Sequence, residues 1–252
     1  MGRLATQSSI ERGLQWFLRH WLLLFNVVWG FYVVAPLSAP LFMNRGMTTA
    51  AQVVYTLYST QCHQLPERSY FLFGDKVSYS LDEIDAARGS NDNRMFELRK
   101  FIGTEQMGWK VAWSDRMISL WTSIFVASLV YAVLRKQKPK HIPIALLLLL
   151  LLPLAVDGSS HFVADILNPV GAGFRDSNDW LRQLTGGIFS NGFYRGDAVG
   201  SFNSLMRLIT GVVAGAGIAG FVLPLLDGAL DAAMHPVPHQ MAGAIKREPS
   251  GE

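Results

Sequence analysis

The stretch "LMRLITGVVAGAGIAGFVLPLL", residues 205–226, decides the fold class of this chain. It carries one charged residue, Arg207, and is long enough for a helix that crosses a bilayer, which needs about 20 apolar residues. Gly211 and Gly215 lie four positions apart, and small residues at this spacing let two helices pack closely in a membrane. The stretch therefore predicts a transmembrane helix packed tightly against a neighbour.

The composition of the whole chain agrees with this interpretation. Of its 252 residues, 50% are hydrophobic and only 16% are charged, a balance that is rare in soluble domains of this length. Residues 21–43, 111–134 and 142–163 are also apolar enough to span a bilayer. The first of them is longer than a signal-peptide core and lacks a clear cleavage site. We therefore predict an all-α, polytopic membrane protein with about four transmembrane helices.

The distribution of cations predicts the orientation of these helices. The loop "RKQKPK", residues 135–140, holds four cations and no acid, three arginines precede the first helix, and Lys246 and Arg247 lie in the tail. Four alternating helices place all three regions on one side, and the positive-inside rule makes that side cytoplasmic. We expect a multi-pass protein of the cell membrane with both termini in the cytoplasm.

This topology divides the chain into three parts. We expect a cytoplasmic N-terminal segment at residues 1–20, a four-helix membrane domain at residues 21–226, and a disordered cytoplasmic tail at residues 227–252. The membrane domain would include a small outer helical subdomain at residues 44–110 and an outer loop at residues 164–204.

The outer subdomain has two helical patterns. Residues 47–62 space their apolar side chains as an amphipathic helix that could lie on the membrane. The stretch "NDNRMFELRKFIG" is typical of an Asn-capped helix that ends at Gly103. No strand pattern stands out in this region.

The only cysteine of the chain, Cys62, lies beside His63 in "TQCHQLPERS", residues 60–69. A single cysteine cannot form an intrachain disulfide, and the loop lacks the spacing of a closed zinc site. His63 and Arg68 could activate the thiol as a nucleophile or a soft metal ligand. Alternatively, Cys62 and His63 only pin the loop through packing and hydrogen bonds.

The third apolar stretch ends in acidic and imidazole side chains. If the helix continues past Asp157, then Asp157, His161 and Asp165 recur every four residues on one side. Two carboxylates and an imidazole on one face could hold a divalent metal, with Cys62 and His63 as further candidate ligands. The alternative is that Asp157 caps or turns the chain and His161 lies at the membrane interface.

Charged residues within the spans need partners, because an ionised side chain in hydrocarbon costs several kcal/mol. Asp115 and Arg116 fall in the outer part of the second stretch, and Arg207 falls at the outer start of the fourth. We predict that Asp115 and Arg207 form an ion pair.

The sequences "NDWLRQLTG" and "NSLMRLITG" repeat one pattern, Asn-x-x-x-Arg-x-x-Thr-Gly. The pattern places Arg182 in the first copy, and Asn203 and Arg207 in the second. Such a face could bind a phosphate or a carboxylate. It could equally be two Asn-capped helix starts with an arginine at the headgroup boundary.

The motifs "CHQLPERSYFLFG", "WSDRMISLW", "PLAVDGSSH" and "NSLMRLITG", in this order, resemble a widespread prokaryotic family of predicted integral membrane proteins of unknown function, marked by a Cys-His-Gln-x-Pro-x-Arg-Ser motif. The resemblance runs from about residue 55 to residue 226 and implies the fold and the location of a site, but no reaction. Many members carry a second cysteine where this chain has Ser114, and often glutamine where it has His161. A site that needs two cysteines would therefore be broken here.

Three classes of function stay open. The first is a binding or accessory membrane protein whose outer polar pocket holds a metal, a lipid headgroup or a partner subunit, which could be a second copy of the chain. The second is a membrane-embedded enzyme for a lipid-linked or anionic substrate, with Cys62 as nucleophile, His63, Asp157 or His161 as acid or base, and arginines as anion ligands. A transporter is less favoured, because the chain has few intramembrane charges and no inverted repeat. No nucleotide-binding, haem-attachment or zinc-protease motif is present, and we expect no nucleic-acid partner.

From the topology we further expect one pocket near the outer face. Its predicted members are Cys62, His63, Arg68, Arg116, Asp157 and Arg207.

Overall fold

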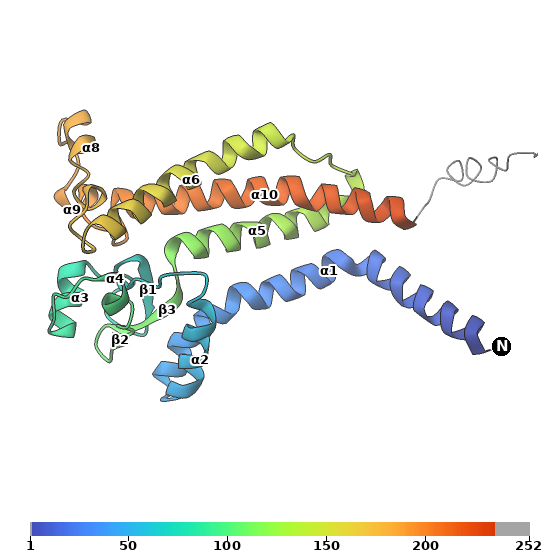
Figure 1. Cartoon of the computed structure of the whole chain (residues 1–252), viewed down its shortest axis with the longest axis horizontal. Coiled ribbons are helices and arrows are strands. Elements are labelled where there is room, and N and C mark those ends of the chain that lie inside the picture. The colour runs from blue at the N-terminus through green and yellow to red at the C-terminus, as the bar shows by residue number, and fades with distance from the viewer. Residues whose placement is uncertain (1, 235–252) are drawn as a thin grey trace, which may run out of the picture.

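The computed structural model describes residues 2–234, with side chains from residue 9 onward. Four long apolar helices run side by side, which confirms the prediction of a mainly helical membrane protein with four candidate spans (Figure 1). They are α1 (Gly2–Asn44), α5 (Asp115–Leu134), α6 (Ile144–Leu167) and α10 (Phe202–Met234). The shorter elements are α2 (Thr48–Tyr58), η1 (Pro66–Arg68), β1 (Ser69–Leu72), α3 (Leu81–Arg88), α4 (Met95–Leu98), β2 (Gly103–Thr104), β3 (Gly108–Ser114), η2 (Arg135–Gln137), α7 (Phe174–Ser177), α8 (Asp179–Leu184) and α9 (Asn191–Tyr194).

Helix α10 packs against both α5 and α6, and glycines at the α5 contact explain the close approach. A Cβ atom on Gly211 would lie 2.0 Å from Ser119 Oγ, and one on Gly215 would lie 1.9 Å from Ser123 Oγ. Both distances are impossible for real atoms, so the two helix backbones meet only because these positions lack side chains. The small-residue spacing is thus a packing feature.

All short elements except η2 gather at one end of the bundle, which we call the polar end (Figure 1). The start of α1, the turn after α5 and the end of α10 lie at the opposite end, which we call the basic end after the cations of residues 135–140. Trp21 Nε1 of α1 donates a hydrogen bond to Asp227 of α10 there, at 3.1 Å. The helices therefore alternate in direction as predicted. Residues 227–234 of the predicted disordered tail are helical instead, because α10 continues to Met234. The rest of that tail, residues 235–252, lies outside the described residues.

The helix ends differ from the predicted ones in two informative places. Helix α6 does continue past Asp157 and ends only at Leu167, despite Gly158. Helix α5 begins at Asp115 rather than at Val111, because residues 108–114 form strand β3.

A three-stranded antiparallel sheet in the order β1-β3-β2 corrects the expectation of a purely helical subdomain. Val111, Ala112 and Trp113 of β3 are all fully buried, so the strand shows no alternation of apolar and polar residues. Strands β1 and β2 are only four and two residues long, too short to give a pattern. The sheet was hidden in the sequence for these reasons.

The helices of the subdomain also need one correction. Helix α2 is present as predicted. The predicted Asn-capped helix is only the four-residue α4, its N-cap is Arg94, and Gly103 lies in β2. A stronger cap occurs at α3, where Ser80 and Glu83 form a capping box.

Candidate functional site

The loop after α2 holds Cys62 against the start of α5. Cys62 Sγ accepts hydrogen bonds from the backbone N–H of Gln64 at 3.3 Å and of Ser114 at 3.4 Å. The thiol can donate to Ser114 Oγ, also at 3.4 Å. Ser114 directly precedes α5, so the half-buried sulfur lies at the N-terminal end of a 20-residue helix.

Gln64 fixes the path of this loop. Its backbone has a positive φ of 54°, a conformation that costs energy for a residue other than glycine. Its buried side chain donates from Nε2 to the carbonyl oxygens of Tyr55 and Ala112, at 2.9 Å each. These two bonds tie the loop to α2 and β3, so the placement of Cys62 is determined by the surrounding structure.

A cavity of about 160 Å³ opens beside the cysteine, and we call it the Cys62 pocket. Three of its lining residues are arginines from different segments, and none of the described residues that line it is acidic. The lining consists of Gln61, Cys62, His63, Gln64, Leu65, Arg68, Ser114, Arg116, Met117 and Arg207.

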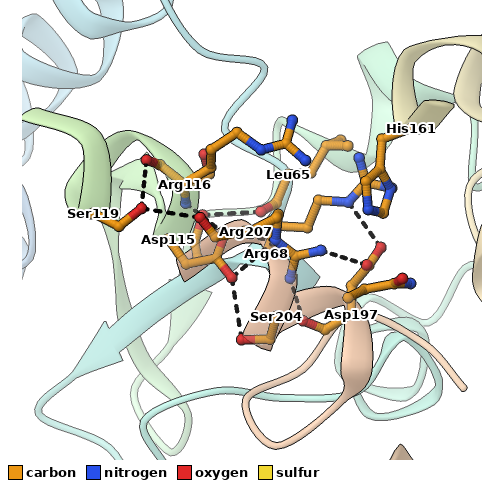
Figure 2. Close-up of polar contacts among 12 residues, drawn as sticks. Leu65, Arg68, Asp115, Arg116, Ser119, His161, Asp197, Ser204 and Arg207 are labelled. Atoms are coloured by element: carbon orange, nitrogen blue, oxygen red, sulfur yellow. Dashed lines mark hydrogen bonds and ion pairs between the residues drawn. The ribbon is translucent and has the colours of Figure 1, made fainter. Parts of the chain in front are cut away.

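The carboxylates lie behind these arginines, in a buried arrangement that we call the arginine–aspartate network. Figure 2 shows the part of it around Arg68 and Arg207. Its members are Arg68, Arg116, Arg175, Arg207, Asp115, Asp157, Asp165 and Asp197.

Arg207 pairs with two acids. Its Nε lies 2.8 Å and 2.9 Å from the two carboxylate oxygens of Asp115, which confirms the predicted ion pair. Its Nη1 lies 2.5 Å from Asp197 Oδ1, and its Nη2 donates to the Asp197 carbonyl at 2.6 Å. Ser204 Oγ adds a hydrogen bond to Asp115 at 3.3 Å. The guanidinium is thus satisfied on every nitrogen.

Arg68 reaches two further acids. Its two terminal nitrogens bind both carboxylate oxygens of Asp165, at 2.6 Å and 2.8 Å. Its Nε lies 2.8 Å from Asp197, which therefore bridges Arg68 and Arg207. Such paired geometry is the strongest that arginine forms with a carboxylate.

The third part of the network centres on Asp157. Arg116 Nη2 binds one of its oxygens and Arg175 Nη2 binds the other, each at 2.7 Å. Arg175 also donates to His161 Nε2 at 3.2 Å, so that nitrogen acts as an acceptor. Arg116 makes no other ion pair among the described residues, and its buried Nε has no hydrogen-bond partner there.

The network balances four arginines with four aspartates. Removing several charges from water is costly, and the paired geometry offsets that cost only while every partner is present. Three of the four arginines, Arg68, Arg116 and Arg207, line the cavity, and none of the four aspartates does, so the pocket itself is electropositive although the network is neutral by formal count.

Two further ionisable side chains are fully buried near the network. Burial raises the pKa of Glu67 to about 7, although the adjacent Arg68 opposes the shift. The described residues offer neither oxygen of Glu67 a well-formed hydrogen bond, and Arg68 Nε lies 3.5 Å away. Burial also lowers the pKa of Lys110 to about 7, while Glu67 opposes that shift. Lys110 Nζ donates to the carbonyl oxygens of Gln64 and Arg99, at 2.7 Å each.

Other groups outside the spans are also shifted. Burial would raise the pKa of Asp197, but Arg68 and Arg207 outweigh it and hold that pKa below its usual range. Burial raises the pKa of Asp176 to about 6, with Asp197 adding to the shift. Burial lowers the pKa of His63, and the remaining charges only modify this effect.

The structure brings most of the predicted pocket residues together. The Cys62 pocket is lined by five of the six predicted residues, Cys62, His63, Arg68, Arg116 and Arg207. The sixth, Asp157, does not line the pocket but forms an ion pair with Arg116.

The proposed metal ligands are not arranged around a common point. Asp165 is bound by Arg68, Asp157 by two arginines, and His161 Nε2 lies 4.0 Å from Asp157. Within residues 9–234, no group of three or more His, Cys, Asp or Glu side chains could hold a metal ion. The helical spacing of these residues therefore serves pairing with arginines instead.

The repeated Asn-Arg-Thr pattern is not functionally equivalent in its two copies. Asn178 Nδ2 donates to Asn203 Oδ1 at 3.2 Å, so the two asparagines meet. Arg207 is buried in the network, whereas Arg182 packs over the ring of Tyr194, with 5.9 Å from its guanidinium carbon to the ring centroid. Arg182 therefore lies outside the pocket.

Sequence reasoning missed Asp197 and Arg175 as members of the network. Asp197 is the only acid between residues 180 and 226, a stretch that also holds Arg182, Arg195 and Arg207. A single acid among three arginines, close before the fourth span, is a signal that could have pointed to a buried partner for Arg207.

The comparisons with known proteins agree with a membrane fold. Residues 106–195 match the family model described as "Predicted membrane protein (DUF2085)". The matched region contains "WSDRMISLW" and "PLAVDGSSH" but begins after Cys62 and ends before "NSLMRLITG", so it does not cover the cysteine motif. The chain is also similar to "Uncharacterized protein MJ1492" of Methanocaldococcus jannaschii, at 26% identity over 60% of this chain and 72% of that protein. No solved structure matches.

Proposed function

We propose that this membrane protein binds a small oxyanion, or the anionic group of a larger molecule, in the Cys62 pocket. The observation that carries the proposal is that, of the residues the structure describes, three arginines and no acid line a cavity of about 160 Å³. A water molecule takes up roughly 30 Å³ in the liquid, so the space corresponds to about five waters, enough for a sulfate-sized or phosphate-sized group. Guanidinium groups are the preferred partners of such planar or tetrahedral oxyanions.

Arg116 supplies the free capacity for this ligand. Arg68 and Arg207 each already pair with two aspartates, whereas Arg116 pairs only with Asp157 within the described part of the chain and is the most exposed of the three, at 20%. We therefore infer that Arg116 makes the main contact with the anion, while Arg68 and Arg207 supply a fixed positive potential.

The single cysteine makes a direct test simple, because every thiol reagent reports on this pocket. We expect the negatively charged iodoacetate to react with Cys62 faster, relative to neutral iodoacetamide, than it does with a free thiol in solution. Sulfate or phosphate should slow both reactions in the folded protein. Arg116→Gln should remove the preference for the charged reagent and the protection, whereas the matched variant Arg182→Gln should keep both.

The opposite result is equally clear. If neither anion protects Cys62 and the ratio of the two rates equals that of a free thiol, the pocket does not bind anions. If Arg116→Gln and Arg182→Gln reduced the preference for iodoacetate and the protection by anions equally, the effect would come from the overall charge of the protein and not from the pocket.

A second candidate function is supported by the surroundings of the sulfur. The sulfur accepts hydrogen bonds from two backbone N–H groups at a helix N-terminus, so Cys62 could act as a nucleophile that attacks the bound anionic substrate and displaces a leaving group from it, with His63 beside it as the acceptor of the thiol proton. Intact mass spectrometry of protein purified without reductant would detect a covalent adduct that is absent in Cys62→Ser. Unaltered anion binding by Cys62→Ser, with no adduct in the parent protein, would favour the binding role alone.

The cation distribution supports an outward-facing pocket. We propose that the polar end faces the outside and that both termini are cytoplasmic, because the loop at residues 135–140 has four cations and no acid.

A further inference from the structure

The basic end of the bundle carries a second cavity, far from the Cys62 pocket along the helices (Figure 1). It has a volume of about 540 Å³ and lies between η2, the loop that follows it and the last turns of α10. Arg135, Lys136, Lys138 and Lys140 line it together with two acids, Asp227 and Asp231. The cavity is therefore cationic, and it lies where a span leaves the membrane.

The two acids are already engaged. Asp227 lies 2.6 Å from Arg135 and also accepts a hydrogen bond from Tyr131 at 3.1 Å. Asp231 lies 3.4 Å from Lys138. Among the described residues, no ion pair involves Lys136 or Lys140, and both side chains are exposed. Two lysines are thus left to attract an anion.

An apolar groove of about 470 Å³ continues from this cavity along α5 and α10 toward the middle of the membrane. Val126, Val130 and Val212 line its walls and remain 52%, 52% and 43% exposed. Ala216 and Gly220 line it as well, and their small size leaves the groove open. Tyr131, Pro139, Lys140 and Pro224 line both the groove and the cavity. The cationic space and the apolar space are therefore continuous.

We propose that this composite site binds one anionic phospholipid, with its phosphate among the lysines of residues 136–140 and an acyl chain in the groove between α5 and α10. The complementary charge selects an anionic headgroup, because basic clusters at the end of a span attract such lipids. The apolar groove accounts for the chain, since it lies in the part of the molecule that faces hydrocarbon. A soluble anion would use only the first half of this site.

The test uses the purified full chain in a neutral detergent, with phosphatidylglycerol and phosphatidylcholine of identical acyl chains as the added probes. We expect phosphatidylglycerol to raise the melting temperature and to remain bound in native mass spectra, and phosphatidylcholine to do neither. The double variant Lys136→Gln with Lys140→Gln should lose at least tenfold in apparent affinity. The matched control, Arg94→Gln with Lys100→Gln, removes two exposed cations at the other end of the molecule. It should retain the affinity for phosphatidylglycerol.

The groove is tested separately. Ala216→Phe places a ring in the groove from an exposed position and should weaken binding severalfold, whereas Val133→Phe, at a lipid-facing position of α5 outside the groove, should not. Glycerol 3-phosphate alone should not reproduce the stabilisation.

Several outcomes would overturn the proposal. They are equal stabilisation by both lipids, a loss of lipid affinity in the control variants equal to that in the test variants, and full stabilisation by glycerol 3-phosphate. A stabilisation that depends on protein concentration and not on lipid would instead show that a second copy of the chain covers the groove.

Discussion

Replacing Asp115 by asparagine should show how much the ion pair with Arg207 contributes to the free energy of unfolding. Asparagine keeps the shape of the side chain and can still accept the backbone N–H of Arg116, which Asp115 Oδ1 accepts at 2.7 Å. The change therefore removes mainly the charge that faces Arg207. The two side chains are 4% and 2% exposed, so solvent does little to replace the lost partner.

The expected magnitude follows from this burial. Breaking a buried ion pair on one side costs about 3–5 kcal/mol, because the remaining charge stays in a poorly solvated site. Arg207 keeps Asp197 as a partner, which places Asp115→Asn at the lower end of this range. We expect Asp115→Asn and Arg207→Gln each to lower the free energy of unfolding by an amount of this order. The double variant should lose about as much as the worse single variant, so the coupling energy equals the smaller of the two single losses, about 3 kcal/mol or more.

The assay is denaturant unfolding in detergent, followed by tryptophan fluorescence. Arg182→Gln serves as the control, since that arginine packs over one ring at the surface, and its loss should cost less than about 1 kcal/mol. If the single variants fail to accumulate, the double variant should accumulate better than either. Losses that add within about 0.5 kcal/mol in the double variant would show that the two residues do not stabilise each other.

Three further predictions concern Glu67, Ser114 and Cys62. The pKa of Glu67 rises from 4.5 to about 7 on folding, so the folded state binds more protons than the unfolded state between these pH values. The free energy of unfolding should therefore fall as the pH rises through this window, by up to about 3 kcal/mol. Melting curves of Glu67→Gln should show a correspondingly weaker pH dependence. Lys110 has a pKa of about 7 in the folded state, so below that pH it is protonated in both the folded and the unfolded state. It should therefore affect the pH dependence of stability only above about pH 7. Ser114→Cys should form a disulfide with Cys62 under mild oxidation, because the two side-chain atoms already lie 3.4 Å apart; a free-thiol count of two after oxidation would contradict this geometry. A membrane-impermeant thiol reagent should label Cys62 in intact cells, given a denatured control that proves accessibility, and labelling only after lysis would reverse the proposed orientation.

The long helices could be predicted from the sequence because the bilayer imposes a simple rule on length and composition. The pairing of Asp115 with Arg207 followed from the same rule, since two opposite charges at similar depth have few other ways to be satisfied. Strand β3 could not be found in this way, because a run such as "VAW", residues 111–113, is buried on both sides and looks like part of a span.

The candidate site was predictable only in part, for a different reason. Asp165 was correctly singled out, but as a metal ligand, because helical spacing shows which side chains share a face and not what they face. Asp197 lies in an irregular loop, where no periodicity relates position to direction. Its role depends on tertiary contacts with Arg68 and Arg207 from distant segments.

The order in which the network's parts are synthesised has a consequence for biogenesis. Asp115 precedes Arg207 by 92 positions, and Asp197 comes only 10 positions before it. Three spans must therefore leave the translocon before the first of these acids can meet its partner, and until then the start of α5 carries an uncompensated charge at the membrane boundary. A chain that stops before α10 would leave Asp115 without its arginine, whereas Asp157 and Asp165 of α6 would keep theirs, which lie outside α10. The last span thus supplies the one arginine that the start of α5 needs.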